Sequence, residues 1–269
     1  MELAQPILLG LLQGATEFLP VSSSGHLVLA ETFFKIKEAG LAFDVALHLG
    51  TLVAVVIYFQ TELLAMARAV ARPGDLAPEA RDNRRLTLLL LVATIPGGLL
   101  GKLFANRIEA ALRQPLLVAA ALAGTGLILL WAEGVGRRCR DFQHIGMLDA
   151  VVLGLAQAFA LVPGVSRSGA TMTVGLFRGL DRTAAARFSF LMSVPIIAGA
   201  GALHLIKIVR HGLMPGQGSF FALGFVASAI SGYLFIAFIM RYIQTRSFAI
   251  FAYYRFAVAA MVLGWVWWH

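Results

Sequence analysis

Long apolar stretches alternate with short polar connectors along the whole chain. Six stretches reach the roughly 20 residues needed to cross the hydrocarbon core of a bilayer. They cover about 42–66, 86–104, 115–133, 184–206, 218–241 and 248–268. The connectors at 67–85 and 134–146 contain several arginines and are predicted to be solvated loops. We therefore expect one membrane domain, residues 1–269, that crosses the bilayer several times.

Two further apolar regions, 3–35 and 147–180, are interrupted in the middle by proline, glycine and serine. Each is predicted to form two short helices joined by a turn, because the interruption is too polar for a simple span. Such a pair enters and leaves the membrane on one side, and its turn must be sheltered by protein or line a cavity. The expected fold is an all-α integral membrane protein with six transmembrane helices and four short re-entrant helices.

The two interrupted regions match each other without a gap, at an offset of 144 residues, as from Gly10 to Gly154. The matching pairs are Gly10 and Gly154, Gln13 and Gln157, Ser22 and Ser166, Ser24 and Ser168, and Gly25 and Gly169. Chance is the alternative, since glycine and serine are common in membrane helices. A duplication predicts repeat halves of approximately 1–133 and 147–269, joined by the loop 134–146. Three spans separate the two regions, so the halves are predicted to be inverted, with both turns near the membrane interior.

The composition and the placement of charge agree with a membrane protein. Only 13% of the residues are charged and 59% are hydrophobic, whereas soluble domains carry about 25% charged residues. The net charge of +8 lies in short runs between apolar stretches, which is typical of cytoplasmic loops and does not indicate a nucleic-acid partner. The bias predicts that the loops 67–85, 134–146, 178–182 and 241–247 are cytoplasmic and that both termini lie outside the cytoplasm. Cys139 is the only cysteine, so no intrachain disulfide forms.

The first interrupted region carries polar side chains on both sides of its turn. Gln13 and Glu17 are four residues apart and share one helix face. The turn at 20–25 places hydroxyls and unpaired backbone N–H groups at the start of the next helix, just before His26. A helix start of this kind favours negative charge, phosphate above all. The candidate residues here are Gln13, Glu17, Ser22, Ser23, Ser24, Gly25 and His26.

The second turn, at 163–171, repeats this device and adds the guanidinium of Arg167, a planar donor that engages two phosphate oxygens at once. Its other candidates are Ser166, Ser168, Gly169 and Thr171. Ionisable residues at membrane depth are costly and are functional hypotheses by default. Together Glu17, His26 and Arg167 supply an acid or metal ligand, an imidazole and a cation, with hydroxyls as nucleophiles. This set suits hydrolysis of a phosphate or diphosphate.

A purely structural interpretation stays open for these residues: the hydroxyls cap broken helices, Glu17 pairs with Arg167, and His26 is a satisfied interior histidine. Asp44 and His48, four apart on the next apolar stretch, are weaker candidates that face the same site or support it. Asp149 and Gln157 are expected to support the second hairpin. The sequence contains no Gly-rich nucleotide loop, no Cys/His metal motif and no Gly-x-Ser-x-Gly elbow.

The segments Gln-Gly-Ala-Thr-Glu-Phe-Leu-Pro-Val-Ser-Ser-Ser-Gly-His at 13–26 and Pro-Gly-Val-Ser-Arg-Ser-Gly-Ala-Thr at 163–171 closely resemble the undecaprenyl-diphosphate phosphatase family of the bacitracin-resistance type. The resemblance covers nearly the whole chain. It implies a bacterial inner-membrane hydrolase that removes the terminal phosphate of undecaprenyl diphosphate and so recycles the lipid carrier for cell-wall polysaccharides. It also implies an inverted repeat with a site that is reached from the periplasm.

By motif position, Glu17, Ser23, His26 and Arg167 match the family's catalytic residues. The resemblance assigns the substrate-binding set to Gln13, Ser22, Ser24, Gly25, Ser166, Ser168, Gly169 and Thr171. It implies Mg²⁺ or Ca²⁺ bound through Glu17, with Gln13 or Asp44 supporting this ligand and not contacting the metal directly. Gln13 stands where family members often have glutamate, so this chain has one carboxylate fewer for a metal. One carboxylate and substrate phosphates still suffice for Mg²⁺.

Three attacking groups fit the residue types: Ser23 activated by His26, which ranks first, His26 itself, or a water activated by Glu17 or His26. The rival function is a polyprenyl-phosphate flippase or transporter, because broken helices in inverted repeats are transporter architecture. A transporter needs no nucleophile. A non-catalytic scaffold is the third alternative and leaves buried Glu17 and Arg167 unexplained. The expected partners are the polyprenyl diphosphate and membrane lipids, and the sequence also allows a homodimer.

Overall fold

The computed structural model describes residues 3–34, 40–211 and 217–268, and these residues are almost entirely helical. A single isolated bridge, between Arg140 and Leu180, is the only β pairing in these ranges. The helices are α1 Ala4–Phe18, α2 Ser23–Phe33, α3 Gly40–Tyr58, α4 Gln60–Ala71, α5 Pro78–Leu112, α6 Pro115–Val135, the short 3₁₀ helix η1 Phe142–His144, α7 Met147–Phe159, α8 Arg167–Phe177, α9 Arg182–His211, α10 Gln217–Tyr242 and α11 Ala249–Trp268.

Within the described ranges, five helices contain stretches long and apolar enough to cross a membrane, and a sixth span is counted if α3 and α4 are taken together. The five stretches are Pro78–Phe104, Pro115–Val135, Arg182–Leu203, Gly218–Tyr242 and Ala249–Trp268. Many of their large apolar side chains are exposed on the outside of the bundle, as expected for contact with lipid. The chain is therefore a multi-pass helical membrane protein.

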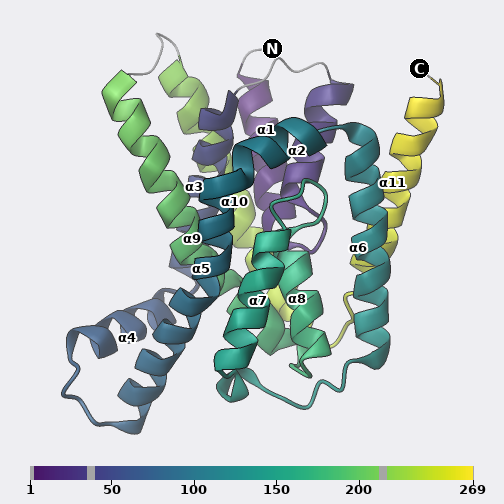
Figure 1. Cartoon of the computed structure of the whole chain (residues 1–269). Coiled ribbons are helices and arrows are strands. Elements are labelled where there is room, and N and C mark those ends of the chain that lie inside the picture. Colours follow the sequence, from purple (N-terminus) through teal and green to yellow (C-terminus); the bar gives the residue numbers. More distant parts are fainter. Residues whose placement is uncertain (1–2, 35–39, 212–216, 269) are drawn as a thin grey trace.

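The apolar stretch at 42–66 is not one straight helix. Helix α3 ends at Tyr58, and α4 continues from Gln60 at an angle of 81° to it, leaving the bundle as a separate arm (Figure 1). Phe59, at the bend, is 2% exposed and packs against Tyr58 and Phe190. The core thus holds the end of α3, while the polar start of α4 turns outward.

The predicted stretch at 86–104 is the middle of a much longer helix, α5, which spans 35 residues and contains Pro96. Proline removes a backbone hydrogen bond and bends a helix. The last part of α5 runs across one end of the bundle before α6 begins (Figure 1). Helix α9 likewise contains Pro195.

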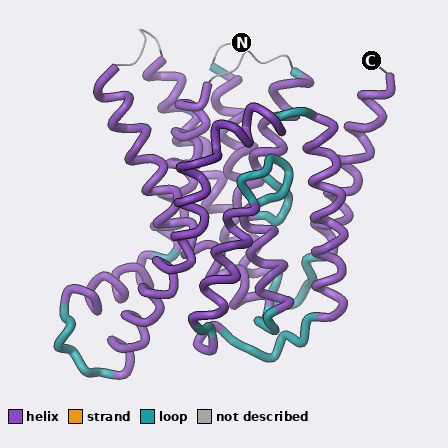
Figure 2. The backbone as a smooth tube through the Cα atoms, viewed as in Figure 1, coloured by secondary structure: helices purple, strands orange, loops and turns teal. Residues whose placement is uncertain are grey.

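Two helical hairpins, α1–α2 and α7–α8, enter the bundle from opposite ends, and their turns meet in its middle (Figures 1 and 2). Each turn ends at a serine with positive φ, 75° at Ser22 and 72° at Ser166. Few residues other than glycine adopt this conformation. Both serines accept the N–H of a glycine three residues on, Gly25 or Gly169, so each caps the second helix of its hairpin.

Small residues bring each hairpin close to a long helix of the bundle. Helix α1 packs along α10, and α7 packs along α5. A side chain at Gly10 would overlap the carbonyl oxygen of Gly224 in α10, and one at Gly154 would lie 2.5 Å from the carbonyl oxygen of Ala93 in α5. Close backbone approach through small residues is typical of helices packed in membranes. The hairpins are thereby held rigidly in the interior.

Candidate functional site

A cavity of about 390 Å³ lies where the two hairpin turns meet. Its polar wall contains the carboxylate of Glu17, the guanidinium of Arg167 and serine hydroxyls from both hairpins. The cavity also has an apolar lining, which includes Leu27, Leu161, Ile196 and Ile197. The candidate residues that line the cavity are Glu17, Ser23, Ser24, Asp44, His48, Ser166 and Arg167. The cavity can therefore receive a molecule with one charged end and one apolar end.

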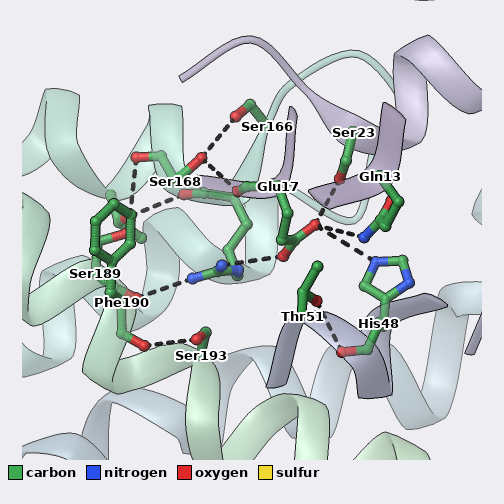
Figure 3. A network of polar contacts seen from close by, with 12 residues as sticks. Gln13, Glu17, Ser23, His48, Thr51, Ser166, Ser168, Ser189, Phe190 and Ser193 are labelled. Carbon is green, nitrogen blue, oxygen red and sulfur yellow. Dashed lines mark hydrogen bonds and ion pairs between the residues drawn. The ribbon is translucent and has the colours of Figure 1, made fainter. Parts of the chain in front are cut away.

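Glu17 is the centre of the polar wall (Figure 3). Its Oε2 atom accepts hydrogen bonds from Ser23 Oγ at 2.6 Å and from Gln13 Nε2 at 3.0 Å. The Nε2 atom of His48 lies 3.6 Å from the same oxygen. With 6% of its surface exposed, Glu17 needs these partners, because an unpaired buried carboxylate is costly. The carboxylate is thus fixed in one orientation beside the Ser23 hydroxyl.

Arg167 joins the two hairpins to α9. Its Nη2 donates to Glu17 Oε1 at 3.1 Å, and its Nη1 donates to the backbone carbonyl of Ser189 at 2.9 Å. Both contacts come from one planar group, which fixes the guanidinium beside the cavity. This contact joins residues 150 positions apart and is the pair that the purely structural interpretation expected.

Hydroxyl groups of the second hairpin complete the connection. Ser168 Oγ lies within hydrogen-bond distance of the backbone carbonyls of Glu17 and Leu19, at 3.1 and 3.0 Å. Thr171 Oγ1 lies 2.7 Å from Ser189 Oγ and 2.8 Å from the Arg167 carbonyl. These two side chains hold the backbone around the cavity and do not line it.

His26 lies elsewhere than the favoured mechanism required. Its Nδ1 is 2.7 Å from the Ser22 carbonyl and its Nε2 is 2.8 Å from the hydroxyl of Tyr254, so both ring nitrogens are engaged. The ring stacks on Tyr254 and does not line the cavity. The hydroxyl of Ser23 donates to Glu17 instead. The arrangement therefore favours Glu17 over His26 as the proton acceptor for Ser23.

The remaining predicted ligands are structural parts of the turns. Ser22 and Ser166 cap α2 and α8, and Ser166 alone of the two also lines the cavity. A side chain at Gly25 would lie 3.2 Å from the Cα of Gly164 in the other turn. Gly25 and Gly169 are thus required for close contact, which explains glycine at both positions.

Several polar residues at the site carry no motif and were not predicted. Arg113 lines the cavity mouth, with its Nη2 2.6 Å from Glu31 and 3.7 Å from Asp44. Tyr254 and Arg255 of α11 contact His26 and Pro20 of the first hairpin and do not line the cavity. The available signal was an arginine inside the apolar stretch 248–268, where an ionisable residue is unusual.

Asp149 anchors the second hairpin at the end of the bundle away from its turn. It pairs with Arg140 at 2.6 Å and Arg178 at 2.7 Å and accepts the N–H of Gly146 at 2.9 Å. Burial raises the pKa of this carboxyl, but the hydrogen bonds from Arg140, Gly146 and Arg178 outweigh it and lower the pKa to about 2. The predicted supporting role of Asp149 is confirmed.

The fold and the site define a class: multi-pass helical membrane proteins with a carboxylate, a hydroxyl and a guanidinium gathered between two interior hairpins. Residues 6–261 match the family model described as bacitracin resistance protein BacA, and the chain belongs to that family.

Three relatives, each named undecaprenyl-diphosphatase, match almost from end to end. The relative from Rubrobacter xylanophilus is 53% identical, over 97% of each chain. The relative from Moorella thermoacetica is 45% identical over 99% of each chain, and that from Caldicellulosiruptor bescii is 46% identical over 97% of this chain and 96% of its own. The resemblance seen in the two motifs therefore extends over the whole protein.

Proposed function

We propose that this protein hydrolyses undecaprenyl diphosphate to undecaprenyl phosphate and inorganic phosphate, and so recycles the lipid carrier for cell-wall polysaccharides. The observation that carries the proposal is the Ser23 hydroxyl donating to Glu17, with Arg167 on the other carboxylate oxygen. A pure transporter needs binding groups but no nucleophile and base in contact. The names of the relatives support the same activity.

In the proposed first step, Ser23 Oγ attacks the terminal phosphorus and passes its proton to Glu17. The bond from this phosphorus to the bridging oxygen breaks, and undecaprenyl phosphate leaves. Glu17 gives this proton to the departing lipid phosphate. Water then loses a proton to Glu17 as it attacks the phosphoserine, inorganic phosphate leaves, and the Ser23 oxygen takes that proton to restore the hydroxyl. Arg167 holds the phosphoryl oxygens and neutralises the charge that develops on them.

Ser24 and Ser166 line the cavity and are proposed to donate hydrogen bonds to the diphosphate. Seven further residues are proposed to affect the substrate indirectly, by holding the hairpin turns in place. His26 does so through its contacts with Ser22 and Tyr254. The other six are Gln13, Ser22, Gly25, Ser168, Gly169 and Thr171. The apolar lining at Ile196 and Ile197 takes the first isoprene units of the lipid.

A divalent cation, Mg²⁺ or Ca²⁺, fits the oxygen atoms present. Gln13 Oε1 is buried without a hydrogen-bond partner and belongs to the side chain that bonds Glu17. No group of three or more His, Cys, Asp or Glu residues suitable for a metal occurs in the described ranges, so the protein alone offers few ligands. Glu17 and Gln13 would hold the ion together with phosphate oxygens, with Asp44 nearby on the cavity wall. A bound cation would supply further neutralisation of the diphosphate charge.

For the placement in the membrane, we propose six transmembrane and four re-entrant helices in an inverted repeat, within one domain. The halves are 1–133 and 147–269, joined by the loop 134–146. Two parallels support this: the positive φ of Ser22 and Ser166, and the entry of the hairpins from opposite ends (Figure 1). The site then opens to the periplasm of a bacterial inner membrane, with both termini on that side.

Phosphate release by the purified protein in detergent tests the function, with undecaprenyl diphosphate as substrate. We expect release from the parent protein and at least a hundredfold slower release after Arg167→Ala or Glu17→Gln. Arg137→Ala, an exposed loop arginine, is the matched control. A parent protein that releases no phosphate, or variants as fast as the parent, would refute the proposal.

A further inference from the structure

Arg255 is a buried cation in the first half of α11, with 1% of its surface exposed. Its Nε donates to the Pro20 carbonyl at 2.5 Å and its Nη1 donates to Thr125 Oγ1 at 2.7 Å. Its Nη2 is buried without a hydrogen-bond partner. None of the ion pairs found among the described residues includes Arg255. The guanidinium therefore carries a charge that no carboxylate balances in that part of the chain.

This side chain lies directly behind the meeting point of the two hairpins. Pro20 belongs to the first turn, and a side chain added at Gly169 of the second hairpin would overlap Nη2. Gly169 donates its N–H to Ser166, which lines the cavity together with Arg167. Gly169 of α8 thus lies between the Arg255 guanidinium and Ser166 on the cavity wall.

Arg255 is the cation near the hairpin turns that lacks a carboxylate partner among the described residues. Glu17 pairs with Arg167, and Arg113 on the cavity lining pairs with Glu31 and lies 3.7 Å from Asp44, whereas Nη2 of Arg255 has no hydrogen-bond partner. An unpaired charge at membrane depth is costly and usually serves function. An anion in the cavity would give this charge a partner, and the low dielectric of the interior strengthens that attraction.

We propose that Arg255 is a positioning residue whose positive charge, which has no carboxylate partner, attracts a diphosphate into the cavity. It is not a catalytic residue, because it does not line the cavity. The identity of the lipid diphosphate rests on the proposed function, but the attraction for a diphosphate group does not.

A purely structural anchor makes the opposite prediction for stability. Removing an anchor lowers the unfolding temperature, whereas removing an unbalanced buried charge raises it or leaves it unchanged. Arg255→Met removes both the charge and the hydrogen bonds, Arg255→Gln removes the charge and keeps donors, and Arg255→Lys keeps the charge. Arg246→Gln, in the exposed loop before α11, is the control.

The experiment uses the purified full chain in detergent and measures three quantities: binding of inorganic diphosphate by titration calorimetry, the unfolding temperature, and KM and kcat for undecaprenyl diphosphate. We expect Arg255→Gln and Arg255→Met to raise the Kd and KM about tenfold or more, with kcat changed by less than about threefold. Arg255→Lys and Arg246→Gln should stay within about threefold of the parent. The unfolding temperature of Arg255→Met should equal or exceed that of the parent.

Unchanged diphosphate binding in Arg255→Gln overturns the inference. An Arg255→Met protein that unfolds at a lower temperature than the parent also overturns it. So does an Arg255→Met protein that fails to fold when Arg255→Lys folds. The proposed function fails separately. A parent that binds diphosphate through Arg255 but releases no phosphate refutes the phosphatase and leaves the charge assignment standing. If the parent hydrolyses the lipid and Arg255→Gln has an unchanged KM, the charge assignment is refuted and the phosphatase function stands.

Discussion

Ser23 Oγ and Glu17 Oε2 are 2.6 Å apart, a short hydrogen bond between the two helices of the first hairpin. This geometry is typical of a nucleophile and its base. Ser23→Ala is expected to lower kcat by roughly 10²–10⁴-fold, the range for loss of proton transfer in the transition state. Ser24→Ala, which alters the neighbouring cavity-lining hydroxyl, should cost less than about tenfold because Ser24 has no bond to Glu17.

Steady-state phosphate release by both variants checks this prediction. A ³²P-labelled terminal phosphate adds a second readout, since a phosphoserine should accumulate briefly in the parent and never in Ser23→Ala. Equal losses in Ser23→Ala and Ser24→Ala would argue for a water as the attacking group.

Arg167 contacts Glu17 and the Ser189 carbonyl with different nitrogens of one guanidinium. Lysine retains the charge but has no planar fork, so it cannot hold both partners and the phosphate together. Arg167→Lys is therefore expected to lower kcat/KM by about 10²–10³-fold. The matched control is Arg137→Lys in the exposed loop, which should behave as the parent. Full activity in Arg167→Lys would mean that charge alone is sufficient at this position.

Asp149 makes the stability depend on pH in the acidic range. Its pKa is about 2 in the folded protein and 3.8 ordinarily, so the unfolded chain binds the proton more readily. The stabilisation is complete above about pH 4 and is lost as the pH falls towards 2. Unfolding temperatures measured between pH 6 and pH 2 should fall more steeply in the parent than in Asp149→Asn.

At neutral pH, Asp149→Asn should lower the free energy of unfolding by roughly 2 kcal/mol, less than for a fully buried ion pair because Arg140 and Arg178 are partly exposed. Asp82→Asn, an exposed aspartate with no ion pair among the described residues, is the comparison. Parallel pH curves for parent and Asp149→Asn would contradict the assignment.

Cys139 allows a direct test of orientation, because it is the only cysteine and is exposed in the loop between α6 and α7. A membrane-impermeant maleimide should not label Cys139 in intact cells and should label it after permeabilisation. Trp267→Cys, made in a Cys139→Ser background, should be labelled in intact cells, since Trp267 is 92% exposed at the other end of the bundle. The reversed pattern would put the cavity on the cytoplasmic side.

Hydropathy located the spans well because a bilayer imposes a minimum apolar length. It could not predict the bend at Phe59, since the few polar residues at the start of α4 are followed by further apolar ones and the direction of α4 depends on packing at Tyr58 and Phe190. The length of α5 was also underestimated, because its polar first turns are helical outside the apolar stretch.

At the site, the pairing of Glu17 with Arg167 was expected only under the purely structural interpretation of the motifs, and the structure contains it. The motifs did not predict the direction of His26, because the partner that turns its ring, Tyr254, lies 228 residues away. Spacing within a motif reports which residues share a segment. The orientation of each side chain depends on helices that contribute no recognisable motif, such as α11.

The position of Arg255 also has a consequence for how the protein is made. The ribosome delivers the Glu17 hairpin first and α11 last, so the first turn spends most of translation without the guanidinium that later binds Pro20. A truncated or half-inserted chain therefore holds the Ser23 hydroxyl but lacks the charge proposed to bring a diphosphate to it. Full affinity for the substrate is then expected only once the final helix has packed against the first hairpin.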